Sequence, residues 1–470
     1  MGRVPHGPRP LAVGLGLGAG VPLGLLAASG VAAAHPGIGS KFDAPVPLPL
    51  LFGGAALTVA ATAGYLVAAD RPVRTGDRPL ASVGPGTARV VRATASIGFL
   101  LLFAVVLLEG AFGRQAQLEN LATVVVWPLW LKGVAVVAVL AGSPWRVLSP
   151  WRTLYRGLCR LEGDEIALRG FPDRLGSWPA LAGVLLLGFV ENLTVVPREP
   201  LPTTALLAGY AVLMLLGGVA FGPAWFDRAD ALAVLYRLLG RVRVIDVRRT
   251  GAGGSGGSGG YAVRLRPPWR GALDPVPVPE VGVVVAAVYT VSFDGFRETP
   301  EFAAVAAVVR EALGPGLATA LPVYLAGFAL FVGAFVAAAW ATAVVLDRPP
   351  KETARRLAPT VLPIAAAYEV AHNVDYLLLN AGLAVELLAD RADVAVAVDP
   401  AAWLSLPAYW GLQVALVVLG HVVAVVAAHA VLVRFAGGGR AVGRAHVPLT
   451  LLMVLFTLVS LWTVSRPVVS

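Results

Sequence analysis

The chain has 470 residues, of which 57% are hydrophobic and only 14% are charged, and its mean hydropathy is +0.76. Because soluble domains of average composition are about a quarter charged, this chain has too few charged residues to cover a large water-exposed surface. The net charge of +9 comes mostly from arginine. In a membrane protein that excess belongs in cytoplasmic loops and requires no nucleic-acid partner. The single cysteine, Cys159, excludes an internal disulfide and a cysteine-based metal cluster.

Residues 1–34 have the pattern of a secretory signal peptide. Arg3 and Arg9 form a basic region, an apolar stretch follows at 11–28, and the alanines at 32–34 fit a small-residue cleavage site. Cleavage there makes His35 the mature amino terminus, outside the cytoplasm. The alternative is an uncleaved first helix.

Apolar windows of about twenty residues recur along the remaining chain, 35–470, and each is long enough to cross a bilayer as a helix. We therefore predict an all-α fold, a polytopic transmembrane helical bundle of about ten spans in a lipid bilayer. The predicted spans are 48–69, 93–113, 121–142, 178–196, 203–223, 281–296, 318–346, 357–388, 403–433 and 446–465. The sixth is short, and we expect the polar run 292–295 to break it.

The distribution of arginine predicts the orientation. If His35 is outside, the loops that fall inside are those near 70–92, 143–177, 224–280, 347–356 and 434–445. Each of these loops has more basic residues than its neighbours, as the positive-inside rule requires. The prediction is a multi-pass protein of the cell membrane with both mature termini outside.

The largest predicted cytoplasmic loop is 224–280. Residues 224–242 have the pattern of an amphipathic helix in the membrane interface, with Trp225, Phe226 and Tyr236 among the residues facing lipid. The segment 251–260 (GAGGSGGSGG) is a flexible linker by composition. Since no Gly-Lys-Ser/Thr follows it, it is not a phosphate-binding loop, and the chain has no nucleotide motif.

A duplicated Ser-Pro-Trp-Arg motif, at 143–146 and 149–152, lies where the third span meets the cytoplasm. Tryptophan and arginine at this level are typical membrane anchors at the lipid headgroups. The alternative is a specific lipid or anion site.

Ionisable residues within the predicted spans are costly in lipid and mark a candidate site. Glu369, His372 and Asp375 are spaced three apart on the eighth span, and His421 and His429 lie on the ninth. Because His372 and His421 are both near the predicted midplane of antiparallel neighbours, we expect them to face each other at the centre of the functional site.

Three interpretations of this polar set stay open. His372, His421 and Asp375 suit a transition-metal ion such as copper or zinc. The same residues suit a proton or ion pathway, because histidine titrates near neutrality. Finally, they suit interhelical hydrogen bonds that only hold the spans together.

A second set lies near the predicted outer face of the membrane. It consists of His35, Glu109, Glu191, Asn192 and Asp294. Together these residues suit an outward-facing cation site, and an amino-terminal histidine chelates copper well. Taken one at a time, they also suit simple caps at helix ends.

Short motifs along the mature chain resemble a family. They are His35-Pro-Gly-Ile-Gly with Asp43-Ala-Pro-Val-Pro, Pro144-Trp-Arg with Pro150-Trp-Arg, Phe221-Gly, the run 233–240, Ser292-Phe-Asp-Gly-Phe, Ala371-His372, and Gly420-His-Val with Ala428-His. They resemble a family of prokaryotic multi-pass membrane proteins labelled fenitrothion hydrolase. The resemblance implies hydrolysis of an organophosphate triester. The chain departs from the family pattern at Pro36 and in the glycine/serine insert 251–260.

Three classes of function follow from the residues and the resemblance. The first is a transporter or permease for an ion or small solute, with a transition metal among the candidates, through a polar seam between spans eight and nine. The second is a membrane-embedded, metal-dependent hydrolase or oxidase. The third is a structural membrane component. The lack of a separate catalytic domain favours the first over an enzyme.

The orientation is testable with reporter fusions. A fusion at Gly256 should report a cytoplasmic location, and a fusion at Ser470 an external one, because the arginine-rich loops face the cytoplasm. If both fusions report the same side, the predicted topology is wrong.

Overall fold

The computed structural model describes residues 47–69, 73–249, 260–437 and 440–465. The predicted signal peptide, His35, Asp43 and most of the glycine/serine linker lie outside these residues. Within them, nine helices are long and apolar enough to cross a membrane. They are α2 (Leu48–Ala69), α3 (Pro85–Phe112), the continuous α4–η2–α5 (Leu121–Ala141), the segment Asp173–Leu193 that ends in α8 (Trp178–Leu193), α9 (Pro200–Phe221), α12 (Val278–Arg297), α14 (Leu317–Leu346), α17 (Leu406–Ala436) and α18 (Arg440–Val464). The chain is a polytopic helical bundle, as predicted.

The predicted eighth span is helix α16 (Leu362–Asp390), which is as long as the nine but carries Glu369, His372 and Asp375 along its length. It packs tightly against α17. A Cβ atom added at Gly420 would lie only 2.4 Å from the Cβ atom of Ala367, so glycine is required for this close approach. Small residues at such crossings allow helices to associate in lipid by van der Waals packing.

The polar run 292–295 does not break the sixth span, contrary to the sequence expectation. Helix α12 continues through it to Arg297. The Ser292 hydroxyl donates to the Val288 carbonyl at 2.8 Å, and Asp294 is paired with another helix. Because 67% of the apolar window of α12 is buried inside the protein, polar side chains there meet protein rather than lipid.

Shorter helices complete the helical part. They are α6 (Trp145–Leu148), α7 (Pro150–Glu162), α10 (Pro223–Arg228), α11 (Ala231–Leu239), α13 (Pro300–Leu313) and α15 (Pro350–Leu357). The predicted single interfacial helix 224–242 is therefore two helices. Phe226 and Tyr236 are buried in the protein instead of facing lipid, which corrects that prediction.

A small antiparallel sheet, which the sequence did not indicate, has the strand order β1-β3-β2. Its strands are β1 (Arg78–Val83), β2 (Ile245–Arg249) and β3 (Tyr261–Leu265), with Val247 of β2 and Ala81 of β1 both opposite Val263. Asp246 is buried beside Arg243 and Arg248. Burial opposes its ionisation, but the hydrogen bond and charge of Arg243, with the charge of Arg248, hold the pKa of Asp246 below its ordinary value.

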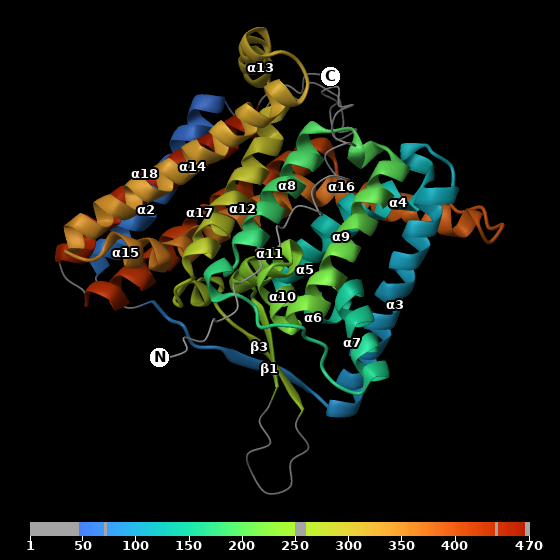
Figure 1. Cartoon of the computed structure of the whole chain (residues 1–470). Coiled ribbons are helices and arrows are strands. Elements are labelled where there is room, and N and C mark those ends of the chain that lie inside the picture. Colours follow the sequence, from blue (N-terminus) through green and yellow to red (C-terminus); the bar gives the residue numbers. More distant parts are fainter. Residues whose placement is uncertain (1–46, 70–72, 250–259, 438–439, 466–470) are drawn as a thin grey trace, which may run out of the picture.

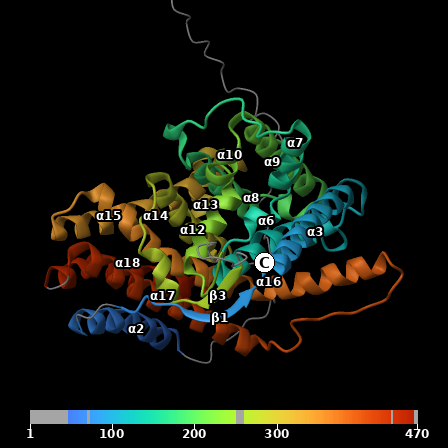
Figure 2. The same cartoon turned by 90° about the horizontal axis from the view of Figure 1, so that it is seen from below.

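The sheet and α7 lie at one end of the bundle, and α13 lies at the other (Figure 1). The view from below in Figure 2 again shows α7, α9 and α10 side by side. The end with the sheet holds segments of the arginine-rich loops, and we refer to it as the arginine-rich end.

The two Ser-Pro-Trp-Arg motifs converge on a pair of aspartates rather than on lipid. The indole N–H groups of Trp145 and Trp151 both donate to Asp230 Oδ2, at 3.0 and 2.7 Å. The arginines that follow them, Arg146 and Arg152, both pair with Asp227. Since the two tryptophans are fully buried, they tie the arginine-rich end together and do not anchor it at the headgroups. This corrects the predicted anchor.

Among the described residues, the carboxylate of Asp230 accepts hydrogen bonds from neutral donors and from no cation. Besides the two indoles it accepts the Tyr210 hydroxyl at 2.9 Å and the backbone N–H of Leu232 at 3.0 Å. Burial raises the pKa of Asp230, whereas the hydrogen bonds from Trp145, Trp151 and Tyr210 oppose that rise.

We expect Asp230→Asn to lower the free energy of unfolding by about 2–4 kcal/mol, because an amide N–H₂ would leave buried donors unpaired at about 1–3 kcal/mol each. Asp227→Asn is the matched control. Asp227 is partly exposed, so its loss should cost only about 1 kcal/mol. Thermal denaturation in detergent compares the two variants, and equal losses would contradict the distinction.

Candidate functional site

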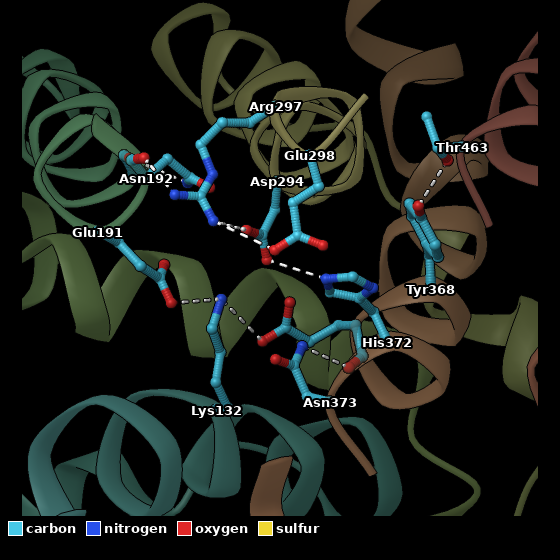
Figure 3. Close-up of polar contacts among 12 residues, drawn as sticks. Lys132, Glu191, Asn192, Asp294, Arg297, Glu298, Tyr368, His372, Asn373 and Thr463 are labelled. Carbon is cyan, nitrogen blue, oxygen red and sulfur yellow. Dashed lines mark hydrogen bonds and ion pairs between the residues drawn. The ribbon is translucent and has the colours of Figure 1, made fainter. Parts of the chain in front are cut away.

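A lysine in the middle of the third span is the centre of the polar interior. Lys132 is buried, and its Nζ atom lies 3.0 Å from Glu191 Oε1 and 3.8 Å from Glu369 Oε1. The two carboxylates come from α8 and α16, so three helices meet at one cation (Figure 3). We call these three residues the lysine triad.

The local backbone around Lys132 is unusual. The eight residues Val125–Lys132 form a π-helix that contains Pro128, which has no N–H to donate. The N–H of Gly133 donates to the Pro128 carbonyl, five residues back, which is the wide π pattern. Such segments occur frequently at functional sites. Lys132 is the last residue of this segment.

A second group of charges joins the triad from α12. His372 Nε2 lies 3.0 Å from Asp294 Oδ2, and Arg297 is 4.0 Å from the other oxygen of Asp294. Arg297 also donates to the backbone carbonyl of Asn192 at 2.9 Å and pairs with Glu298 at 3.3 Å. Figure 3 shows these side chains pointing toward one another from α8, α12 and α16.

The two groups form one cluster because their residues adjoin on shared helices. Glu369 and His372 are one turn apart on α16, and Glu191 and Asn192 are consecutive on α8. The sequence placed Glu369 and His372 in an intramembrane set, and Glu191, Asn192 and Asp294 in a separate outer-face set. The structure brings these five residues of the two sets into one cluster, a convergence that the sequence did not predict.

The buried charges of this cluster do not balance without a proton. Among the described residues, the buried carboxylates of Glu191, Glu369 and Asp294 meet two fixed cations, Lys132 and Arg297, and the partly exposed Glu298 also pairs with Arg297. Net charge in a low-dielectric interior is expensive, so a proton taken up by His372 or by one carboxylate would stabilise the cluster by reducing its excess negative charge. A bound cation would have the same effect. The arrangement is therefore suited to taking up and releasing a single positive charge.

A small cavity adjoins the lysine triad. Its volume is about 50 Å³, and its wall includes all three triad residues together with Leu235 and Leu239 of α11. That volume is sufficient for water, which needs about 10–15 Å³ of such space. Elsewhere in the cluster, the buried side-chain oxygens of Asn192 and Asn373, which do not line this cavity, have no hydrogen-bond partner among the described residues. The two leucines line the cavity on the side of α11.

The predicted pairing of His372 with His421 is wrong. His372 bonds to Asp294 on α12, whereas His421 Nδ1 bonds to the Val417 carbonyl of its own helix at 2.8 Å. The other ring nitrogen of His421 has no partner among the described residues. Position along the spans placed both residues near the midplane, but the rotation of each helix about its axis decided which neighbour each ring faces.

The remaining predicted site residues are spread over other contacts. Asp375 accepts the Tyr409 hydroxyl at 2.8 Å, which forms a small polar seam between α16 and α17. His429 pairs with His446 of α18 at 3.0 Å. Glu109 on α3 forms an ion pair with Arg391, just beyond α16, and Nε of Arg391 is 2.7 Å from Glu109 Oε1. None of these contacts belongs to the charged cluster.

The predicted metal ligands do not converge. Among the described residues no group of three or more His, Cys, Asp and Glu side chains has the geometry to hold a metal ion. His372, His421 and Asp375 each have a different partner, so the metal interpretation gains no support from the described part of the chain. His35 lies outside it.

Lys132 and Arg297, the two fixed cations of the cluster, were not among the site residues predicted from the sequence. A signal for Lys132 was present, since a lysine at the middle of an apolar span is itself a marker of a functional site. Arg297 had a weaker signal, because an arginine at the end of a span is commonly an interface residue.

Comparisons with family models, curated proteins and solved structures gave no match for this chain. The resemblance to proteins labelled fenitrothion hydrolase therefore stays a prediction.

The charge pairing predicts a distinctive pattern of stability. Lys132→Met should lower the unfolding free energy by about 3–5 kcal/mol, because it leaves Glu191 and Glu369 without their cation. The neutral triple variant Lys132→Met, Glu191→Gln, Glu369→Gln should recover most of that loss, since no buried charge of the triad is left unpaired. Denaturation midpoints in detergent measure both. A triple variant that is less stable than the single one would contradict the pairing.

Proposed function

We propose that the chain is a membrane transporter for an ion or small solute, and that the charged cluster exchanges a proton during the transport cycle. The observation that carries the proposal is the charge balance. Among the described residues, three buried carboxylates and the partly exposed Glu298 outnumber two fixed cations, so one proton added to His372 or to a carboxylate reduces the excess negative charge. Groups of this kind within spans are typical of proton relays and ion pathways.

The order of the residues supports a route for the proton. Glu298 and the Asp294–His372 pair lie toward the end of α12 that is remote from the arginine-rich end, and Glu369 is one turn from His372. Glu369 then reaches Lys132 and Glu191, and the small cavity follows. Leu235 and Leu239 of α11 close the route before the arginine-rich end. Opening at α11 would complete a path across the bundle.

The unequal distances around Lys132 indicate how protonation would act. Lys132 lies 3.0 Å from Glu191 and 3.8 Å from Glu369. Protonation of Glu191 would weaken its hold on the lysine and favour movement of the ammonium group toward Glu369. Each carboxylate thereby controls the charge of the other through one shared cation.

The alternative functions make different demands on the molecule. A metal-dependent hydrolase needs converging ligands, and the described residues contain no such group. If the protein is a structural component, the cluster needs only to contain no unpaired buried charge. The neutral triple variant, Lys132→Met with Glu191→Gln and Glu369→Gln, would then keep full function. The transporter proposal requires the charges themselves.

Reconstituted liposomes test the proposal. With a potassium diffusion potential across the membrane and a pH-sensitive dye inside, the protein should move protons, and Glu369→Gln should reduce the rate to that of empty liposomes. Glu109→Gln is the matched control. It removes a paired carboxylate from another helix outside the cluster, so the rate should stay near that of the unmodified protein. Full proton movement by correctly folded Glu369→Gln protein would refute the role of the cluster.

A different result would favour the structural alternative. If the neutral triple variant is stable and moves protons, or if the unmodified protein moves none under either polarity of the potential, the cluster serves only to hold the helices together.

A further inference from the structure

Helix α7 presents a row of arginines at the arginine-rich end. Arg152, Arg156 and Arg160 are spaced four residues apart and so lie along one face of the helix. Like charges at this spacing repel one another and destabilise a helix unless another group compensates them. The opposite face carries Leu154 and Leu158, both exposed. An exposed apolar face opposite a basic face is typical of a helix in the membrane interface.

The arginines line a pocket that opens at the surface. Its volume is about 420 Å³, and its wall combines the arginine row with Tyr155, Cys159, Glu165 and, from α10, Pro223 and Phe226. Arg152 is fixed within it, because its guanidinium group lies over the Phe226 ring at 5.3 Å and pairs with Asp227 at 2.6 Å. One arginine is therefore pre-organised, and the pocket is large enough for a phosphate group and part of its substituent.

Positive charge in the pocket is not compensated by the protein. Asp227 is shared by Arg146 and Arg152, and within the described part of the chain Glu165 forms no ion pair. The hydrogen bond that Arg156 donates there goes to the backbone carbonyl of Arg146, at 2.9 Å. Arg160 has no hydrogen-bond or ion-pair partner among the described residues. Burial and then repulsion from Arg152, with further arginines beyond it, lower the pKa of Arg156, so a nearby anion would stabilise its charge.

We propose that this pocket binds a phosphate group through Arg156 and Arg160, with Arg152 as its fixed wall. Guanidinium groups bind phosphate oxygens in pairs of parallel hydrogen bonds, which a lysine cannot reproduce. The position of α7 in the interface favours the headgroup of an anionic phospholipid, since basic pockets at this level bind such lipids. A free phosphate ester presents the same chemistry and is the second source. The site is separate from the charged cluster and independent of the transport proposal.

Native mass spectrometry of the detergent-solubilised full chain tests the site. Phosphatidylglycerol should bind more tightly than phosphatidylcholine, and Arg156→Gln with Arg160→Gln should weaken phosphatidylglycerol binding by about 30-fold, at about 1 kcal/mol for each arginine. Arg174→Gln, an exposed arginine outside the pocket, should bind as the unmodified protein does. Equal binding of the two lipids, or unchanged binding by the double variant, would overturn the proposal.

Two further measurements distinguish a lipid headgroup from a free phosphate ester and test the site with a variant that should fold normally. Inorganic phosphate that displaces phosphatidylglycerol indicates a free phosphate ester, and phosphate that fails to displace it indicates the lipid; either result supports a phosphate site. Glu165→Gln removes the unpaired carboxylate from the pocket wall at little risk to folding, so it should tighten phosphatidylglycerol binding by about fivefold. Unchanged or weaker binding by this variant would also overturn the proposal.

Discussion

The packing of the bundle depends on one buried cation with two carboxylate partners. Lys132 interacts with Glu191 and Glu369, so the third span, α8 and α16 must stay together if no charge is to be left alone in a low-dielectric interior. Removing one charge of the lysine triad leaves the remaining buried charges without full compensation, which destabilises the folded protein. The same constraint that fixes the helices thus creates the group of charges that we propose takes up a proton, and stability and function share these residues.

The polar content of each helix matches its position in the bundle. Only 11% of the apolar window of α3 is buried inside the protein, compared with 67% for α12. The charged cluster lies on the buried helices α8, α12 and α16 and on the third span, where side chains can supply the partners that lipid cannot. This explains why α16, which is not among the nine apolar helices, remains continuous for 29 residues.

At the arginine-rich end, two aspartate carboxylates are stabilised in two other ways. Asp230 is held by indole, hydroxyl and backbone donors without any cation, while the neighbouring Asp227 pairs with two arginines. The duplicated motif makes both sets of contacts, since the tryptophan of each copy donates to Asp230 and the arginine of each copy pairs with Asp227. In contrast, Arg156 and Arg160, farther along α7, have no ion-pair partner in the part of the chain that the structure describes, which leaves positive charge that a ligand could neutralise.

The sequence by itself determined the helical, membrane-spanning class and located nine of the apolar helices closely, because length and hydropathy are local properties that lipid imposes on each span. It also identified Glu369, His372, Glu191 and Asp294 as unusual. Only the tertiary structure decided which of them meet. The rotation of each helix about its axis and its packing angle are set by contacts distant in sequence, such as Gly420 against Ala367. For that reason His372 faces Asp294 instead of His421, and Lys132 joins residues assigned to two separate sites.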